Sequence, residues 1–430
     1  MHLVIIGNGV AGVTCALNAR RRDPDAQITI IGDETEWFYS RTALMYAFMD
    51  RLPRRALEPF ERGMWKQQRL NLVHDRVVDL NAERREVRLA SGRVLIYDRL
   101  VLAVGATPVP APWPGSDTVR SGLVNFVSMQ DLDACESAVR GAPRAIVVGG
   151  GLIGIELVEC LVHHRVPTTF IVRDRWYWPV ALCRAEAGLV RECMIRHGVD
   201  VRLGESVAQV HASPEGAFQG VTLTGGERLS APLLGVTIGV RPAVAQFAKF
   251  AHSPAMGRGI RVNAHFETSL PDVYAIGDCA EIQQADGTVL HETIWYSAKR
   301  QGALLGARNL WGDRVPYVPP VFFNSSKLFD LEYTTVGQVT GLPDSTPTVI
   351  LRHTRRPMLV RVVHDGEQVR GFNMLGSRWN HEVLVRWIEE RRSATYVLAH
   401  LLEAQFDVEF GRAPLQQLER QDSTLAEANA

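Results

Sequence analysis

The chain has 430 residues, 46% of them hydrophobic, which at about 150 residues per domain predicts roughly three domains with buried cores and excludes a disordered protein. Lysine plus arginine and aspartate plus glutamate each number 47, so the net charge gives no indication of a nucleic-acid or membrane-surface partner. The six cysteines are widely spaced without a C-x-x-C motif, and the sequence predicts neither a disulfide scaffold nor a metal site. Because no leader and no membrane-spanning apolar stretch is found, we expect a cytoplasmic protein without a membrane span.

An apolar strand, Leu3–Ile6, opens the chain and is followed by a glycine turn and a helical run, Val13–Arg22. The same order of strand, glycine turn and helix returns at Ala145–Val148 and Ile155–His163. A further apolar strand follows each of these units. This internal duplication predicts an α/β protein with two Rossmann-like, doubly wound domains.

Both glycine turns match the G-x-G-x-x-G pattern. A dinucleotide pyrophosphate needs backbone N–H groups at a helix N-terminus, so glycine is required at the turn, at the ligand contact and where helix packs on strand. The glycines in these places are Gly7, Gly9, Gly12, Gly149, Gly151 and Gly154. One such motif can be a tight turn without a ligand, but two motifs in strand–helix context predict two dinucleotides.

The residues after the second strand of each unit indicate which ribose is bound. Asp33 and Glu34 stand in the first unit where a carboxylate binds the adenosine ribose. The second unit has Arg173 and Arg175 in this region, which slightly favours NADPH over NADH, although both can equally be solvated loop charges. Gly154, which is not alanine, favours NADH.

The remaining segments complete the domain layout. The Gly105–Pro108 segment and the prolines after it predict an extended crossing between domains. Beyond Tyr317 the sequence predicts alternating strands, a hairpin turn at Asp365–Glu367 and two amphipathic helices, Glu382–Arg392 and Thr395–Phe406. We therefore expect a discontinuous FAD-binding domain (1–111 and 241–315), an NAD(P)H-binding domain (112–240), a C-terminal α+β interface domain (316–411) and a flexible tail (412–430).

The order of these motifs resembles the FAD-dependent pyridine nucleotide-disulfide oxidoreductase superfamily over about residues 1–375. Besides the glycine motifs, the segments that carry the resemblance are Gly105–Pro108, Gly239–Pro242 and Thr268–Asp278. Within the superfamily, Phe38–Arg41 and the absence of a redox cysteine are most similar to the ferredoxin, rubredoxin and nitrite reductase-type flavoproteins.

The resemblance implies that the first unit holds FAD and the second NAD(P)H. It further implies that Gly105 and Gly277 lie at the cofactor, that Asp278 hydrogen-bonds the ribityl chain and that Arg41 lies by the flavin or its phosphates. Asp278 can also be an ordinary turn aspartate. Members with this third domain often dimerise through it, and the sequence leaves the oligomeric state open.

Three departures from the family bear on mechanism. Disulfide reductases carry redox cysteines where this chain has the segment around Thr42, so a thiol relay is excluded at that position. Electron-transferring members pair a lysine with the glutamate that matches Glu156, but this chain has Tyr46, and burial without that cation would raise the pKa of Glu156. The arginine usual near the entrance to the middle domain is replaced around Met129. Trp295 is expected near the isoalloxazine and nicotinamide rings, or else as a core residue.

We therefore expect an FAD-dependent NAD(P)H oxidoreductase that passes hydride to flavin and electrons on to a small redox protein or small-molecule acceptor. Glu156, Trp295 and Tyr46 are the candidate catalytic residues. The alternatives are an NAD(P)H oxidase that uses oxygen and a flavoprotein with an impaired nicotinamide site that acts as a redox-sensing or assembly partner. Lys327 can reach a ligand or be a solvated charge.

The cysteines carry two further expectations. Cys15 and Cys279 are expected to be small buried apolar residues rather than redox groups. Cys183 and Cys193 could pair only if the fold brings them together.

Overall fold

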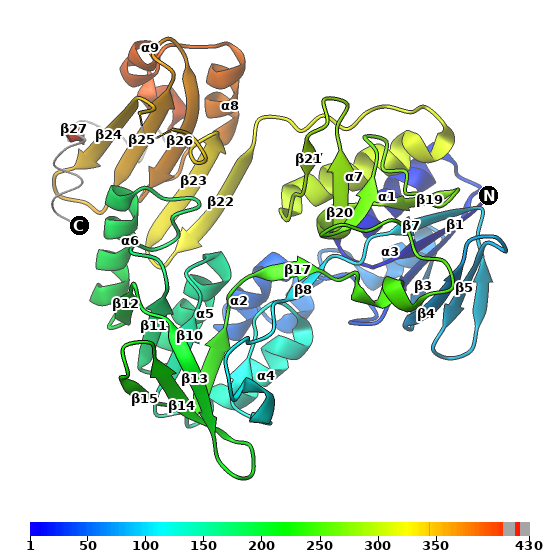
Figure 1. Cartoon of the computed structure of the whole chain (residues 1–430). Helices are drawn as coiled ribbons and strands as arrows, with labels where there is room; N and C mark the ends of the chain where they lie inside the picture. The colour runs from blue at the N-terminus through cyan, green and yellow to red at the C-terminus, as the bar shows by residue number, and fades with distance from the viewer. Residues whose placement is uncertain (344, 407–417, 422–430) are drawn as a thin grey trace. The chain divides into compact units, whose positions relative to one another are not determined.

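The computed structural model describes residues 1–343, 345–406 and 418–421 of the chain (Figure 1). Its contacts divide the chain into two compact units. Unit 1 comprises Met1–Val109, Val127–Ala134 and Gly239–Pro319, and unit 2 comprises Pro110–Phe126, Cys135–Ile238 and Pro320–Ala430. The finer division into an FAD domain, an NAD(P)H domain and an interface domain stays a prediction.

A five-stranded parallel sheet forms the centre of unit 1, in the order β19-β7-β1-β2-β3. Its strands are β1 (His2–Ile6), β2 (Gln27–Gly32), β3 (Leu70–His74), β7 (Arg99–Leu102) and β19 (Val273–Ala275). The central strands are apolar and buried, as expected of a parallel sheet that is covered on both faces. The predicted first strand and glycine turn are thus at the middle of the sheet, where the carboxyl ends of β1 and β2 meet.

Helices α1 (Val10–Arg22) and α7 (Trp295–Ala307) pack against each other in unit 1 (Figure 1). Their backbones approach closely because α7 carries glycine at the contact: a Cβ at Gly302 or Gly306 would lie inside 3.0 Å of the α1 backbone. The helix α7 therefore starts near the turn that begins α1. The other elements are α2 (Leu44–Phe48), α3 (Arg62–Gln67), β4 (Val77–Asn81), β5 (Glu86–Leu89), β6 (Val94–Ile96), β8 (Ala106–Pro108), β17 (Val240–Pro242), β18 (Ile260–Val262), β20 (Ala280–Gln283) and β21 (Val289–Leu290).

The predicted extended crossing is a pair of antiparallel strands, since β8 pairs with β17. One strand leaves unit 1 and the other returns to it. Helix α4 (Met129–Val139) begins in unit 1 and ends in unit 2.

Unit 2 contains a second five-stranded parallel sheet, in the order β12-β11-β10-β16-β9. Its strands are β9 (Leu123–Val124), β10 (Ala145–Val148), β11 (Thr168–Val172), β12 (Asp200–Leu203) and β16 (Leu233–Val236). The helices are α5 (Leu152–His163) and α6 (Arg184–Arg196), and β13 (Val207–Ala212), β14 (Phe218–Leu223) and β15 (Arg228–Ser230) form a small antiparallel sheet. The duplicated Rossmann-like unit predicted from the sequence is confirmed.

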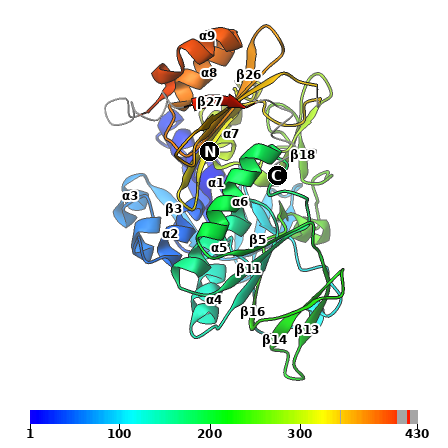
Figure 2. The same cartoon turned by 90° about the vertical axis from the view of Figure 1, so that its left-hand side faces the viewer.

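The C-terminal part of unit 2 is an antiparallel sheet in the order β22-β23-β26-β25-β24-β27. Its strands are β22 (Phe323–Leu328), β23 (Leu331–Gly337), β24 (Thr348–His353), β25 (Leu359–His364), β26 (Val369–Leu375) and β27 (Leu418–Gln421). Helices α8 (His381–Glu389) and α9 (Ala394–Ala399) lie beside one face of this sheet (Figure 2). Phe372 and Trp387 join sheet and helix in one core, so the predicted α+β fold class is confirmed.

Two expectations for this part need correction. The second helix ends at Ala399 and continues as a 3-10 turn, so it is shorter than predicted. Within the predicted flexible tail, Leu418–Gln421 is a strand that pairs with β24, because it supplies the edge partner that β24 otherwise lacks. The rest of the predicted tail lies outside the described residues.

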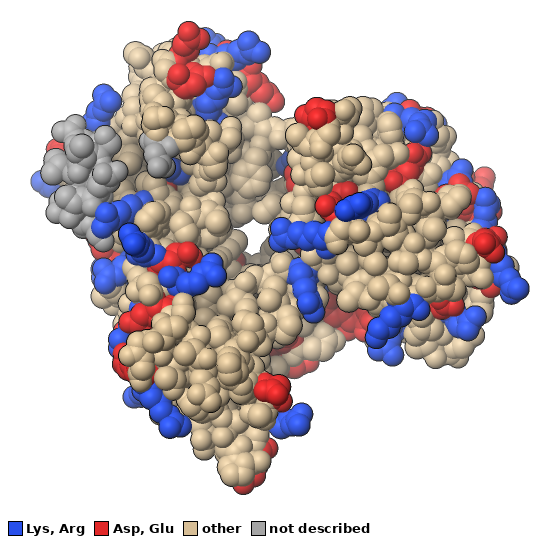
Figure 3. Space-filling view, viewed as in Figure 1, with Lys and Arg blue, Asp and Glu red and all other residues tan. Residues whose placement is uncertain are grey.

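The distribution of surface charge and the hydropathy of the helices both bear on the expectations from composition. Basic and acidic side chains are interspersed over the face shown in Figure 3, as expected from equal numbers of both. No helix within the described residues is both long and apolar enough to cross a membrane.

Candidate functional site

The first glycine turn has the geometry of a phosphate cradle. Gly7 has φ +113°, and a Cβ there would lie inside 3.0 Å of the Ala103 carbonyl oxygen. A Cβ at Gly12 would collide with the Gly7 carbonyl oxygen, so this glycine lets α1 pack on the turn. A Cβ at Gly9 would meet no atom within 4 Å. Gly9 therefore keeps open the space above the N-terminus of α1, whose first N–H groups have no side-chain cap.

The second glycine turn repeats this arrangement in unit 2. Gly149 has φ +127° and abuts the Thr237 carbonyl, and a Cβ at Gly154 would collide with the Gly149 carbonyl oxygen. Gly151 is the N-cap residue of α5, whose N-terminus has no side-chain cap. A Cβ at Gly151 would meet no atom within 4 Å. Both turns thus leave the same central position free for a ligand. The residues present fit a pyrophosphate at each turn.

The end of β2 lies against the first cradle. The Asn8 side chain donates from Nδ2 to the Thr35 carbonyl oxygen at 2.8 Å, which holds the segment after the strand beside the glycine turn. Asp33 in this segment is exposed, and its carboxylate has no hydrogen bond or ion pair within the described residues. It is available to a ribose.

Glu34 is bound by protein groups instead. Its carboxylate pairs with Arg41 at 2.6 Å, accepts the Met129 backbone N–H at 3.1 Å and accepts the Tyr39 hydroxyl. Burial opposes ionisation, but these three donors outweigh it, so the pKa of Glu34 lies below its ordinary value. Glu34 and Arg41, both predicted to bind cofactor, are therefore joined to each other and to the first residue of α4.

The turn that carries Asp278 follows β19 and begins with Gly277, which has φ +75°. The Gly277 N–H donates to Gln301 Oε1 at 2.7 Å, and Gln301 Nε2 donates to Glu292 at 3.1 Å. Glu292 also accepts the Tyr317 hydroxyl at 2.7 Å. This chain of bonds fixes the turn against α7 through Gln301, a residue that the sequence analysis missed because no motif marks it.

Asp278 and Gly105 lie together at this turn. Burial raises the pKa of Asp278, and the charges of Arg41 and His291 act in the opposite direction. Gly105 has φ +67°, open space at its Cβ position, and a backbone N–H near the Cys279 thiol. The structure thus brings the predicted FAD residues of unit 1 to the carboxyl ends of β1, β2, β7 and β19, where open α/β sheets bind ligands.

Trp295 is the first residue of α7. Its indole N–H is buried and has no hydrogen-bond partner within the described residues. Lys299 Nζ lies 5.1 Å from the ring centroid, and the Tyr296 ring lies edge-on at 5.3 Å. A buried donor without an acceptor fits a site that a polar group completes when it binds. Tyr46 is half-buried on α2, just after the turn that carries Arg41.

None of the six cysteines forms a disulfide, and none stands in the segment around Thr42. Cys15 and Cys279 are fully buried, and burial raises the pKa of both thiols, that of Cys279 to about 12. Cys183 is the N-cap residue of α6 and Cys193 lies ten positions along it, which at about 1.5 Å per residue separates them by roughly 15 Å, so they do not pair.

Glu156 lies on α5, two residues after the second glycine motif. Burial raises the pKa of Glu156 to about 8, and the neighbouring Glu159 carboxylate adds to the effect. The expectation that Glu156 is protonated at neutral pH is supported. Lys327, for which the sequence left two roles open, pairs with Glu159 at 2.9 Å.

Arg173 and Arg175 follow β11, as Asp33 and Glu34 follow β2. Both are exposed, and neither forms an ion pair within the part of the chain that the structure describes. The two guanidinium groups are available at the ribose end of the second cradle.

The comparisons with known proteins agree with this geometry. Residues 1–302 match the family model described as pyridine nucleotide-disulphide oxidoreductase. The chain is 28% identical over 376 residues to a nitric oxide reductase FlRd-NAD(+) reductase of Escherichia coli, covering 86% of this chain and 94% of that protein. It is 29% identical over 396 residues to the ferredoxin–NAD(+) reductase component of the p-cumate 2,3-dioxygenase system of Pseudomonas putida, covering 91% and 94%.

The fold is shared with solved structures. A chain in the crystal structure of the covalent putidaredoxin reductase–putidaredoxin complex superposes with a TM-score of 0.78 at 22% identity, covering 96% of this chain and 97% of that one. The predicted combination of two Rossmann-like domains with a third domain is thereby confirmed. The chain therefore belongs to the pyridine nucleotide-disulphide oxidoreductase family, and is an FAD-dependent NAD(P)H oxidoreductase of the electron-transfer reductase type.

Proposed function

We propose that this chain takes electrons from NADH and passes them, through FAD, to a small ferredoxin- or rubredoxin-type redox protein without a cysteine intermediate. The observation that carries the proposal is the pair of open glycine cradles, at Gly9 and Gly151, each above an uncapped helix N-terminus. The names of the relatives support the class of acceptor, because one is a reductase of a flavorubredoxin-type protein and another of a ferredoxin.

In unit 1, the N-terminus of α1 at Gly9 would hold the FAD pyrophosphate, and Asp33 would accept the ribose hydroxyls. Asp278 would hydrogen-bond the ribityl chain, and Arg41, held by Glu34, would place a positive charge beside it. The buried indole N–H of Trp295 would find its acceptor on the cofactor. When bound, FAD supplies the hydride and electron transfer chemistry.

In unit 2, the N-terminus of α5 at Gly151 would hold the pyrophosphate of the nicotinamide dinucleotide. Because the pKa of Glu156 is about 8, its carboxyl is neutral at pH 7 and can donate a hydrogen bond. A neutral group also avoids repelling an anionic dinucleotide. Glu156, with Trp295 and Tyr46, remains the proposed catalytic set, in which these residues orient the reactants and exclude water.

NADH is the proposed reductant. The relatives named above are NAD(+) reductases, which outweighs the slight preference for NADPH that Arg173 and Arg175 suggest. Arg173 and Arg175 are exposed and form no ion pair with the residues that the structure describes, so we expect NADPH to be used more weakly than NADH rather than rejected. Arg173→Glu should leave the KM for NADH within about twofold and raise that for NADPH.

Anaerobic double-mixing stopped flow tests the proposal. The FAD-loaded protein is first mixed with NADH, and the bleached enzyme is then mixed with a plant-type ferredoxin, a rubredoxin or oxygenated buffer. The proposal predicts bleaching by NADH and faster reoxidation by one of the two proteins than by oxygen. Faster reoxidation by oxygen would favour an oxidase, and no bleaching by NADH or NADPH would favour a flavoprotein with an impaired nicotinamide site. Homodimerisation and a cytoplasmic location stay predictions.

A further inference from the structure

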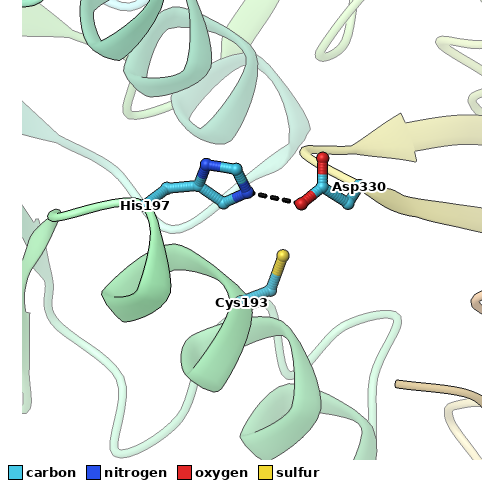
Figure 4. A group of neighbouring side chains, drawn as sticks. All are labelled: Cys193, His197 and Asp330. Atoms are coloured by element: carbon cyan, nitrogen blue, oxygen red, sulfur yellow. Dashed lines mark hydrogen bonds and ion pairs between the residues drawn. The ribbon is translucent and has the colours of Figure 1, made fainter. Parts of the chain in front are cut away.

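Three potential metal ligands meet in unit 2 on elements that the cofactor sites do not use. Cys193 and His197 lie on α6 and at its C-terminal end, and Asp330 lies in the turn between β22 and β23 (Figure 4). One ligand atom from each residue, a sulfur, a ring nitrogen and a carboxylate oxygen, lies within 4.8 Å of the other two. Cys193 and His197 share a helix face because four positions separate them. Asp330 reaches them from 133 residues further along the chain.

The backbone holds these side chains in place. His197 is the last residue to continue α6, with its N–H donating to the Cys193 carbonyl oxygen at 3.2 Å. Its ring stacks on Phe329 with centroids 5.0 Å apart, and its Nε2 lies 2.6 Å from Asp330 Oδ2. The Phe329 N–H donates to Glu159 Oε2 at 3.0 Å, which ties the turn to α5. The three ligand atoms therefore converge without a rearrangement of the chain.

The chemistry of the three groups matches zinc. Thiolate, imidazole and carboxylate are its usual ligands, and one neutral and two anionic ligands balance its double positive charge. In a tetrahedral zinc site, neighbouring ligand atoms lie about 3.4–3.6 Å apart. Here His197 Nε2 and Asp330 Oδ2 are 2.6 Å apart, which is closer than in a zinc site, and no two of the three ligand atoms are more than 4.8 Å apart. Side-chain rotations can close the difference, since the His197 and Asp330 side chains are 35% and 65% exposed.

The sulfur of Cys193 is fully buried, whereas the His197 and Asp330 side chains are partly exposed. The buried sulfur and the two partly exposed side chains leave the fourth position on the solvent side.

We propose that Cys193, His197 and Asp330 bind a zinc ion with water as the fourth ligand. The ion would join α6, which connects strands β11 and β12 of the parallel sheet, to the β22–β23 hairpin of the antiparallel sheet, and so cross-link these two parts of unit 2. The proposed site differs from the expectation that the sequence contains no metal site. The alternative is a histidine–aspartate ion pair beside a buried thiol that binds no ion.

Zinc binding is measured on untagged, FAD-loaded protein that has been treated with EDTA and desalted. Zinc sulfate is added back, and bound metal is counted by plasma mass spectrometry after a second desalting. We expect one zinc per chain, and at least a tenfold lower affinity in each of Cys193→Ser, His197→Gln and Asp330→Asn. Cys183→Ser on the same helix and Asp365→Asn in another hairpin turn are matched controls that should bind zinc as the wild type does.

Cobalt(II) distinguishes coordination by sulfur from loose binding at the surface. The difference spectrum of the FAD-loaded protein with and without cobalt should contain a thiolate-to-cobalt charge-transfer band, and Cys193→Ser should lose it. The proposal is overturned if the protein binds no stoichiometric zinc, if the cobalt complex lacks this band, or if Asp330→Asn and His197→Gln bind zinc like the controls. Cys193 is buried, so its variant can fail to fold. In that case, zinc binding by His197→Gln and Asp330→Asn tests the proposal.

Discussion

Exchanging glycine for alanine at two places in the first cradle separates ligand contact from packing. Gly9 has φ −78° and ψ −176°, which alanine adopts without strain, and its added methyl would meet no protein atom within 4 Å. Gly9→Ala should therefore fold as the wild type does but hinder the approach of the FAD pyrophosphate. If one charge-assisted hydrogen bond is lost, at about 1.5–3 kcal/mol, FAD affinity falls by roughly 10- to 150-fold.

Gly12→Ala, in contrast, should lower the stability of the fold rather than block the ligand directly. Its methyl would lie inside 3.0 Å of the Gly7 carbonyl oxygen, which is backbone and cannot turn aside, so we expect a loss of at least about 1–3 kcal/mol of stability. Thermal unfolding of FAD-free protein and quenching of FAD fluorescence give the two readouts, with Gly188→Ala, at an open helical position of α6, as the control. Wild-type FAD affinity in Gly9→Ala, or wild-type stability in Gly12→Ala, would refute the assigned roles.

Further predictions concern buried charges. The Glu156 carboxyl keeps its proton up to pH about 8 in the folded protein but loses it near pH 4.5 in the unfolded chain. The free energy of unfolding should therefore fall as the pH rises between these two values, by at most about 1.4 kcal/mol per pH unit. Glu156→Gln should remove this part of the slope in thermal unfolding measured from pH 5 to 8, and an unchanged slope would contradict a raised pKa. Arg361 pairs with the fully buried Glu186 at 3.0 Å, so Arg361→Met should cost about 3–5 kcal/mol in denaturant unfolding, and adding Glu186→Gln should restore part of it. Equal stability of wild type and Arg361→Met would show that the pair is not held in solution.

Local spacing explains why much of the fold and the cradles could be predicted. Gly7 and Gly12 are only five positions apart, and a Cβ at Gly12 would collide with the Gly7 carbonyl oxygen. The spacing of the motif therefore predicts this local contact directly. The duplicate at Gly149 and Gly154 follows for the same reason. The strands of a buried parallel sheet can also be recognised in the sequence, because they are continuous apolar runs.

Contacts between distant segments could not be read from spacing. Glu34 follows a strand as a ribose ligand would, yet its carboxylate is bound by Arg41 and by the N-terminus of α4, which lies far along the chain. Lys327 finds Glu159 across 168 positions. The strand β27 was predicted as tail because a short polar segment gives no strand signal until an edge such as β24 is available.

A reductive titration tests the central claim, electron transfer through flavin without a thiol relay, most directly. Under anaerobic conditions, dithionite is added to the FAD-loaded protein while the flavin absorbance is recorded, and NADH is then used in the same way. Because none of the six cysteines forms a disulfide and none stands in the segment around Thr42, we expect complete bleaching after a single two-electron equivalent per FAD with either reductant. A requirement for a second two-electron equivalent, or a failure of NADH to bleach the flavin that dithionite reduces, would contradict it.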